Sequence, residues 1–333
     1  MSQQHPDTKK QTVQGGASVA RGVAIVGGGP AGLMAAEVLA QSGLQVDVYD
    51  AMPSPGRKFL LAGIGGLNIT HSEDYGKFCS RFAEQQQVLQ PALDCFTPEM
   101  LCEWVHGLGV ETFVGSSGRV FPKEMKAAPL LRAWLHRLRS LGVRLHVRHR
   151  WQGWSSKGDL QFSTPAGIVE VRPQATLFAL GGASWPKLGS DGAWVPRLRA
   201  GGVEVAPLES ANCGFEVDWS DYLKDRFSGS PVKSVSLKFT ALDNREIHRP
   251  GELVISQHGV EGSLVYAVSR ELRQRVNAEG AATFMLDLLP GRSEERLRKE
   301  LAGLSRSGHS LPSFFKSRLG ITGVKLALLH EVL

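Results

Sequence analysis

The stretch VAIVGGGPAGLMAAEVLAQSGLQVDVYD, Val23 to Asp50, constrains the fold of this chain more than any other segment. The short apolar run at its start predicts a buried strand, and Gly27, Gly29 and Gly32 then form the pattern G-x-G-x-x-G. In such a turn the first glycine allows a tight exit from the strand, and the second lets a pyrophosphate approach bare backbone. The third lets the following helix pack closely on the sheet. The stretch therefore predicts a βαβ unit that binds a dinucleotide.

The helix and the second strand complete this pattern. Pro30 and Ala31 begin the helix, where the missing N–H of proline is not needed, and the helix amides face the phosphates. Asp50 closes the second strand and is placed to accept hydrogen bonds from ribose hydroxyls. A carboxylate there argues against the 2′-phosphate of NADP but does not distinguish NAD from FAD. A glycine-rich turn in another kind of βαβ unit is disfavoured, because strand, helix and acidic end are all present.

A second glycine-rich loop, GRKFLLAGIGGLNIT from Gly56 to Thr70, distinguishes the two cofactors. An NAD dehydrogenase needs no such loop directly after its second strand. Flavoproteins of the two-domain, glutathione-reductase-like type pass the chain along the cofactor toward the flavin at this point. The apolar residues of the loop argue for burial rather than for a flexible linker. The sequence therefore favours FAD.

On these residues the chain resembles the HI0933-like, or aminoacetone-oxidase-like, family of bacterial flavoproteins, and within it the PP_4765-type branch. The family loop contains GRK, then SGGGRCN and T-N, and the matching positions are Gly56, Arg57, Lys58, Gly63, Gly65, Asn68 and Thr70. The resemblance implies that this loop binds FAD. Gly66 and Leu67 stand where most relatives have Arg and Cys, so the role of that arginine is absent or supplied elsewhere.

The resemblance continues along the chain. GRVFP at 118–122 matches a family turn, and SWPKLGSDG at 184–192 resembles the family segment SYPKTGSTG. Trp151 occupies the position where relatives hold the adenine with backbone atoms. The family sequence ATGG is ALGG in this chain, and the resemblance places Ala179, Gly181 and Gly182 at the edge of the cofactor.

The resemblance implies an α/β fold: a Rossmann-like FAD-binding domain of the two-domain glutathione-reductase type, with an inserted β-plus-helical domain. We expect a disordered tail over 1–21, the FAD-binding domain over 22–205 and the inserted substrate-side domain over 206–333. The latter is expected to be β-rich over 206–290 and helical over 291–333, with one helix over 263–277. Relatives then return to the FAD domain through a G-L-x-x-A-G-E segment, which does not follow Gly323. The resemblance therefore predicts a truncated sequence that retains FAD weakly.

Composition excludes several other classes of protein. The 333 residues carry a formal net charge of +6, which suits anionic ligands, but the basic residues are mostly dispersed, so a nucleic-acid partner is disfavoured. The cysteines at 79, 95, 102 and 213 form no C-x-x-C pair, and we expect neither a metal site nor a redox dithiol. No apolar run suits a membrane span, and the amino-terminal residues lack a signal-peptide pattern. We expect a cytoplasmic protein.

The predicted function is an FAD-dependent oxidoreductase that acts on a small molecule and holds FAD non-covalently. Because no second G-x-G-x-x-G is present, NAD(P)H would have to meet the flavin transiently as an electron donor, or the electron partner is another small molecule or dioxygen. The candidate proton donor is His258, in a turn that can face the flavin in relatives, although an ordinary turn histidine explains it at least as well. The alternatives are an FAD-binding protein without turnover, truncated or acting as a sensor, and an RNA-modification flavoprotein, which is favoured only by the positive charge.

Overall fold

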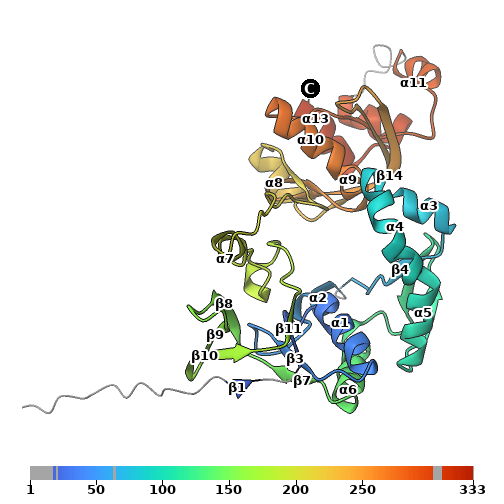
Figure 1. Cartoon of the computed structure of the whole chain (residues 1–333). Helices are drawn as coiled ribbons and strands as arrows, with labels where there is room; N and C mark the ends of the chain where they lie inside the picture. Colours follow the sequence, from blue (N-terminus) through green and yellow to red (C-terminus); the bar gives the residue numbers. More distant parts are fainter. Residues whose placement is uncertain (1–17, 20–21, 63–64, 303–309, 333) are drawn as a thin grey trace, which may run out of the picture. The chain divides into compact units, whose positions relative to one another are not determined.

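The computed structural model describes residues 18–19, 22–62, 65–302 and 310–332. The chain divides into two compact units, the first ending at Leu208 and the second beginning at Glu209 (Figure 1). Each unit has its own sheet and its own hydrophobic core. The two units are therefore described separately.

A four-stranded parallel sheet in the order β11–β2–β3–β7 lies at the centre of the first unit. Its strands are β2 (Val23–Val26), β3 (Val46–Tyr49), β7 (Arg144–His146) and β11 (Ala175–Phe178). Ile25 and Val48 face the helices α1 (Pro30–Gln41) and α6 (Ala127–Ser140), whereas Val26 and Tyr49 belong to the core on the opposite face. This alternation buries the sheet on both faces, as is usual for parallel strands.

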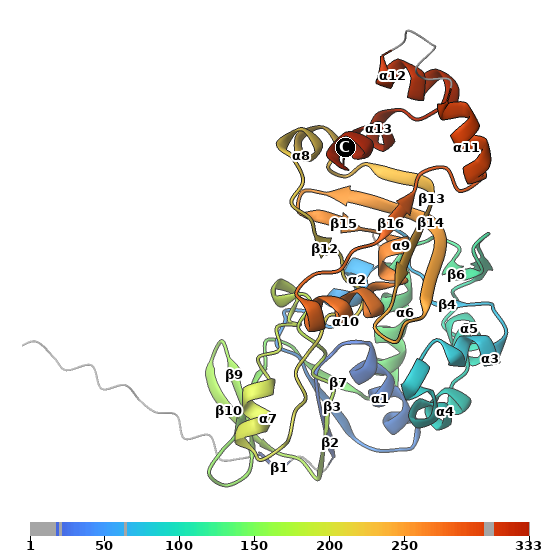
Figure 2. The ribbon, with the colours of Figure 1, turned by 90° about the horizontal axis from the view of Figure 1, so that it is seen from above.

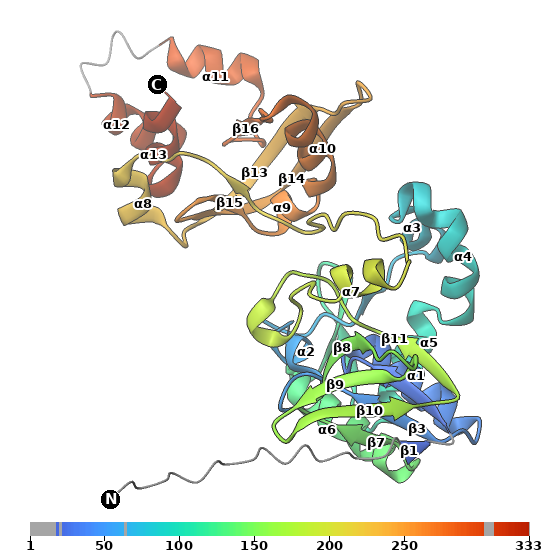
Figure 3. The ribbon, with the colours of Figure 1, turned by 60° about the vertical axis from the view of Figure 1, so that its left-hand side comes forward.

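An antiparallel meander covers the second face of this sheet (Figure 3). It consists of β8 (Arg150–Trp154), β9 (Leu160–Thr164) and β10 (Gly167–Arg172). The expectation of a disordered tail is wrong at two positions, because β1 (Ser18–Val19) pairs in parallel with β10. The unpaired backbone groups at the edge of β10 explain this addition. The other residues of the expected tail before Gly22 lie outside the described residues.

The remaining elements of the first unit surround this three-layer centre. The helices are α2 (Arg57–Ala62), α3 (Tyr75–Ser80), α4 (Gln86–Cys95), α5 (Pro98–Gly107) and α7 (Val195–Ala200), with 3-10 turns at Ala83–Gln85 and Pro186–Leu188. A small antiparallel sheet in the order β4–β6–β5 contains β4 (Thr70–His71), β5 (Thr112–Val114) and β6 (Arg119–Pro122). Leu67, in the second glycine-rich loop, is buried in a core cluster with Val105 and Leu130. This loop therefore packs against the domain, as its apolar residues predict.

A buried carboxylate joins three helices of the first unit. Glu37 of α1 is 2% exposed and accepts hydrogen bonds from the indoles of Trp134 (2.7 Å) and Trp104 (3.2 Å) and from Arg137 (2.9 Å). Trp104 belongs to α5, and the other two donors belong to α6. A buried charge is tolerated when it is paired and hydrogen-bonded, so Glu37 fixes the packing of the helical layer.

The second unit is built on a five-stranded antiparallel sheet in the order β12–β15–β14–β13–β16. Its strands are β12 (Phe215–Glu216), β13 (Pro231–Thr240), β14 (Glu246–Ser256), β15 (Gly259–Glu261) and β16 (Met285–Asp287). Its helices are α8 (Asp221–Phe227), α9 (Ser263–Tyr266), α10 (Ser269–Glu279), α11 (Glu294–Leu301), α12 (Leu311–Phe314) and α13 (Gly323–Val332), with a π-helical turn at Phe315–Leu319. The helix expected over 263–277 is in fact two helices, because Val268 leaves helical geometry (φ −123°, ψ 9°).

Helix α13 lies near α8 and β13 in the second unit (Figure 2), and two of its side chains join it to the rest of this unit. Lys325 donates hydrogen bonds to the carbonyls of Ser234 (3.1 Å), which lies in a bulge of β13, and Leu288 (2.7 Å). Glu331 accepts from the backbone N–H (2.5 Å) and the hydroxyl (2.8 Å) of Ser220, the N-cap of α8. Among the helices that the structure describes, none has the length and apolar character that a membrane span requires.

Replacing Glu37 by alanine should lower the free energy of unfolding by roughly 3 kcal/mol, because the half-buried Arg137 and two indole donors lose their acceptor. Urea unfolding followed by tryptophan fluorescence measures this change. Glu103→Ala is the matched control, since Glu103 is exposed on α5. Its substitution should change the stability by no more than about 0.5 kcal/mol. Equal stabilities for the two variants would contradict the role assigned to Glu37.

Candidate functional site

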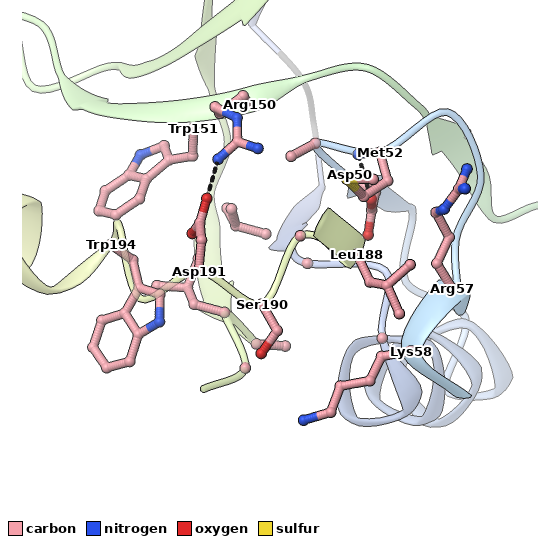
Figure 4. Close-up of a pocket in the computed structure, with 18 of the residues that line it drawn as sticks. Asp50, Met52, Arg57, Lys58, Arg150, Trp151, Leu188, Ser190, Asp191 and Trp194 are labelled. Atoms are coloured by element: carbon pink, nitrogen blue, oxygen red, sulfur yellow. Dashed lines mark hydrogen bonds and ion pairs between the residues drawn. The ribbon is translucent and has the colours of Figure 1, made fainter. Parts of the chain in front are cut away.

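A cavity of about 440 Å³ opens at the carboxyl ends of β2, β3 and β11 in the first unit. Ligands bind at this edge of open α/β sheets, and sites for small molecules measure roughly 300–1,000 Å³. The lining comes from the turn after β2, from residues 49–62, and from two later segments, 149–151 and 179–197. Figure 4 shows the labelled side chains around this space.

The three glycines of the first motif have different surroundings. Gly27 has φ +113°, and a Cβ atom there would lie 2.2 Å from the Ala179 carbonyl oxygen. At Gly32 a Cβ would lie 1.9 Å from the Gly27 carbonyl oxygen. At Gly29, by contrast, a Cβ would meet nothing within 4 Å. Packing within the protein therefore requires Gly27 and Gly32, whereas Gly29 leaves open space at the start of α1, where a phosphate can approach the helix N-terminus.

Asp50 holds the glycine turn in place. Its two carboxylate oxygens accept hydrogen bonds from the backbone N–H groups of Gly28 (2.7 Å) and Met52 (2.7 Å). Burial raises the pKa of the Asp50 carboxyl, and the same two N–H groups oppose that shift. Each carboxylate oxygen can accept more than one hydrogen bond. Asp50 can therefore bind a ligand hydroxyl while it supports the turn, a structural role that the sequence analysis missed.

Two cations from α2 line the same cavity. Lys58 donates a hydrogen bond to the Ser184 hydroxyl (2.6 Å), and Arg57 acts on Asp50 only through its charge. Neither side chain forms an ion pair within 4.0 Å of a carboxylate in the described part of the chain. Together with the N-terminus of α1, the two cations form a site suited to an anion.

Aromatic side chains and an ion pair form the other end of the cavity (Figure 4). Arg150 donates to Asp191 at 2.8 Å, beside Trp151 and Trp194. Burial alone would raise the pKa of Asp191, but hydrogen bonds from the Ala193 N–H and from Arg150 hold it below its ordinary value. The sequence analysis did not predict the involvement of Arg150, Ser190, Asp191 or Trp194. The only available signal was the resemblance of SWPKLGSDG to a family segment.

The structure brings together most of the predicted cofactor residues. The cavity lining includes Gly27, Gly29, Pro30, Asp50, Arg57, Lys58, Trp151, Ala179 and Gly181. It does not include Ala31, Gly32, Gly65, Asn68, Thr70 or Gly182, and Gly63 lies outside the described residues. His258 is exposed between β14 and β15 of the second unit, so its catalytic role stays a prediction.

The described residues contain neither a disulfide nor a candidate metal site. The four cysteines at 79, 95, 102 and 213 are unpaired. Within the described ranges, no group of three or more His, Cys, Asp or Glu side chains is arranged to hold a metal ion.

Comparison with known proteins identifies a family. The model of the HI0933-like protein Rossmann domain matches residues 21–330. A ribosomal RNA dihydrouridine synthase of Haemophilus influenzae is 23% identical over 274 residues, which cover 81% of this chain and 65% of that protein. The chain therefore spans less than two thirds of the length of this curated relative.

Solved structures resemble the chain more distantly. The THI4 protein of Thermovibrio ammonificans has a TM-score of 0.36 at 18% identity, covering 55% of this chain and 64% of that chain. The p-nitrophenol 4-monooxygenase PnpA of Pseudomonas putida has a TM-score of 0.32 at 15% identity, covering 92% of this chain and 64% of that chain.

Gly29→Val should fold normally and lose affinity for FAD, because its side chain would enter the open space at the start of α1. Gly32→Ala should instead destabilise the protein, because its Cβ would clash with the Gly27 carbonyl. Thermal unfolding and FAD titration separate the two effects. Wild-type FAD affinity in Gly29→Val would show that the pyrophosphate binds elsewhere.

Asp50→Asn keeps the size of the side chain and removes its charge. We expect FAD to bind more weakly by about 1–3 kcal/mol, the contribution of a hydrogen bond to a charged group. Equilibrium titration with FAD measures the change, and circular dichroism checks that the turn still folds. An unchanged dissociation constant would move the ribose away from Asp50.

Proposed function

The chain belongs to the HI0933-like family, and on that premise we propose that it is an FAD-dependent oxidoreductase that holds its cofactor non-covalently. The observation that carries the proposal is the combination of groups in one cavity. A glycine turn opens onto the N-terminus of α1, Asp50 offers a carboxylate, and α2 adds Arg57 and Lys58. Pyrophosphate needs the helix terminus and the cations, whereas a ribose hydroxyl needs the carboxylate.

The fit to FAD is supported by the groups that have no partner in the protein alone. The space beside Gly29 is open, and buried donors without acceptors lie in the wall of the cavity. Bound FAD would supply the two-electron hydride chemistry, which no side chain can perform. The side chains of this protein then bind and orient the cofactor, while Trp151 and its aromatic neighbours exclude water from one end of the site.

The electron partners follow from what the sequence contains. Its single G-x-G-x-x-G leaves no second site of that kind for a nicotinamide cofactor, so NAD(P)H would approach the flavin transiently and leave again. A small molecule would then exchange electrons with the flavin. His258 is the candidate proton donor for that reaction.

A second candidate is the reduction of a uracil base in RNA. It is favoured by the similarity to the ribosomal RNA dihydrouridine synthase and by the net charge of +6. In that reaction the C5–C6 double bond of uracil gains a hydride equivalent and a proton, and NAD(P)H supplies the electrons. The excess of basic residues would also attract an RNA substrate, because contacts to phosphates dominate such binding.

The oxidoreductase proposal predicts that purified protein carries FAD and that NADPH or NADH bleaches the flavin absorbance without oxygen. Gly29→Val should show no bleaching, because it should carry no flavin. A variant in which Cys79, Cys95, Cys102 and Cys213 are all serine should bleach as the wild type does. Bound flavin that neither nicotinamide reduces would contradict the proposed donor and favour an FAD-binding protein without turnover.

The two substrate classes are separated by adding ribosomal RNA to the reduced protein and digesting the RNA for mass spectrometry. RNA reduction predicts uridine that is heavier by two hydrogen atoms, and loss of the product in His258→Ala would support His258 as the proton donor. Unmodified RNA together with reoxidation of the flavin by small molecules would reject the RNA candidate and leave the oxidoreductase proposal intact.

A further inference from the structure

Three hydrogen-bonding groups without partners gather in the wall of the cavity. They are the indole N–H groups of Trp151 and Trp194 and the hydroxyl of Ser190, each buried and without a partner in the described structure. All three residues line the cavity. Trp151 is 5% exposed and Ser190 is 7% exposed, whereas Trp194 is half-buried and only its indole nitrogen is covered.

The polar side chains nearby bond to other groups. Asp191 accepts from Arg150 (2.8 Å) and from the Ala193 N–H (3.0 Å), and Gln152 accepts from Arg197 (2.8 Å). An indole N–H can only donate, and a buried donor without an acceptor is costly. A ligand that enters the cavity can supply the acceptor that these groups lack in the described structure.

The position of these donors identifies the part of the ligand that they meet. Figure 4 shows Trp151 and Trp194 on the side of the cavity opposite Arg57 and Lys58, and the indole nitrogen of Trp194 lies on the side of its ring that faces Ser190. The phosphates belong with the cations. The donors are therefore at the end that receives the base.

We propose that Trp194 recognises the adenine base of the bound dinucleotide, its indole N–H donating to a ring nitrogen, with the Ser190 hydroxyl as a second donor at the same end. Adenine suits this role because its unprotonated ring nitrogens are hydrogen-bond acceptors. The inference rests on the proposed FAD function and adds to it the residues that select the base. It assigns Trp194 to binding and gives it no part in electron transfer.

The first test uses Trp194→Phe, which keeps an aromatic ring and removes the donor. Both FAD and ADP should bind about three- to tenfold more weakly, the effect of one lost hydrogen bond. ADP contains the adenosine half without the flavin, so a loss for ADP locates the effect at the base end. Trp185→Phe is the matched control, because Trp185 is 50% exposed and does not line the cavity. Its affinity for both ligands should equal that of the wild type.

The second test uses ADP analogues in which N1, N3 or N7 of adenine is replaced by CH. For the wild type, one analogue should bind less tightly than ADP. For Trp194→Phe, that analogue and ADP should bind equally tightly. Unchanged ADP affinity in Trp194→Phe, or the same loss for that analogue in both proteins, would overturn the role of Trp194. A wild-type protein that binds ADP but not FAD would reject the proposed function and leave base recognition standing.

Discussion

Hydrogen bonds of its backbone groups hold the glycine turn after β2, and the site depends on this constraint. The Gly27 N–H donates to the Tyr49 carbonyl (2.8 Å), the Gly56 N–H donates to the Gly28 carbonyl (2.8 Å), and the Gly28 N–H donates to Asp50. The turn is thereby joined to β3 and to the start of α2. Because the turn is already ordered, ligand binding loses no conformational entropy in ordering it.

Whether a feature could be predicted depends on how local its cause is. Gly27, Gly29 and Asp50 could be identified because one βαβ unit fixes their spacing along the chain. Arg150 and Asp191 are 41 residues apart, and their pairing depends on how the meander and a later loop meet, for which the sequence has no period or motif. The same holds for Glu37. Its position on α1 predicts an ordinary exposed glutamate, but α5 and α6 place three hydrogen-bond donors around it. The sequence does not predict the helix break at Val268, because the spacing of apolar residues continues across α9 and α10.

The structure explains why Gly66 and Leu67 differ from the residues of the family loop. Gly66 has φ +112°, and a Cβ there would lie 2.5 Å from the methyl group of Met125. Leu67 is 4% exposed within a hydrophobic cluster. The two positions where most relatives have Arg and Cys therefore serve packing in this chain. A long charged side chain at Gly66 would have to displace Met125 and adopt a backbone conformation that favours glycine.

The charges in the cavity also determine the direction in which a dinucleotide can lie. Asp50 repels phosphate, whereas Arg57, Lys58 and the N-terminus of α1 attract it. The ribose can approach the carboxylate only if the pyrophosphate turns toward the cations. The base must then point away from α2, toward Trp151 and Trp194. A reversed ligand would place phosphate beside the buried indoles and Arg150, whose charge is already paired with Asp191. Its charge would then meet Arg197, which donates to Gln152, in place of Arg57, Lys58 and the N-terminus of α1. The orientation with phosphate at α2 therefore brings the ligand charge to two cations and a helix N-terminus and leaves the carboxylate for the ribose.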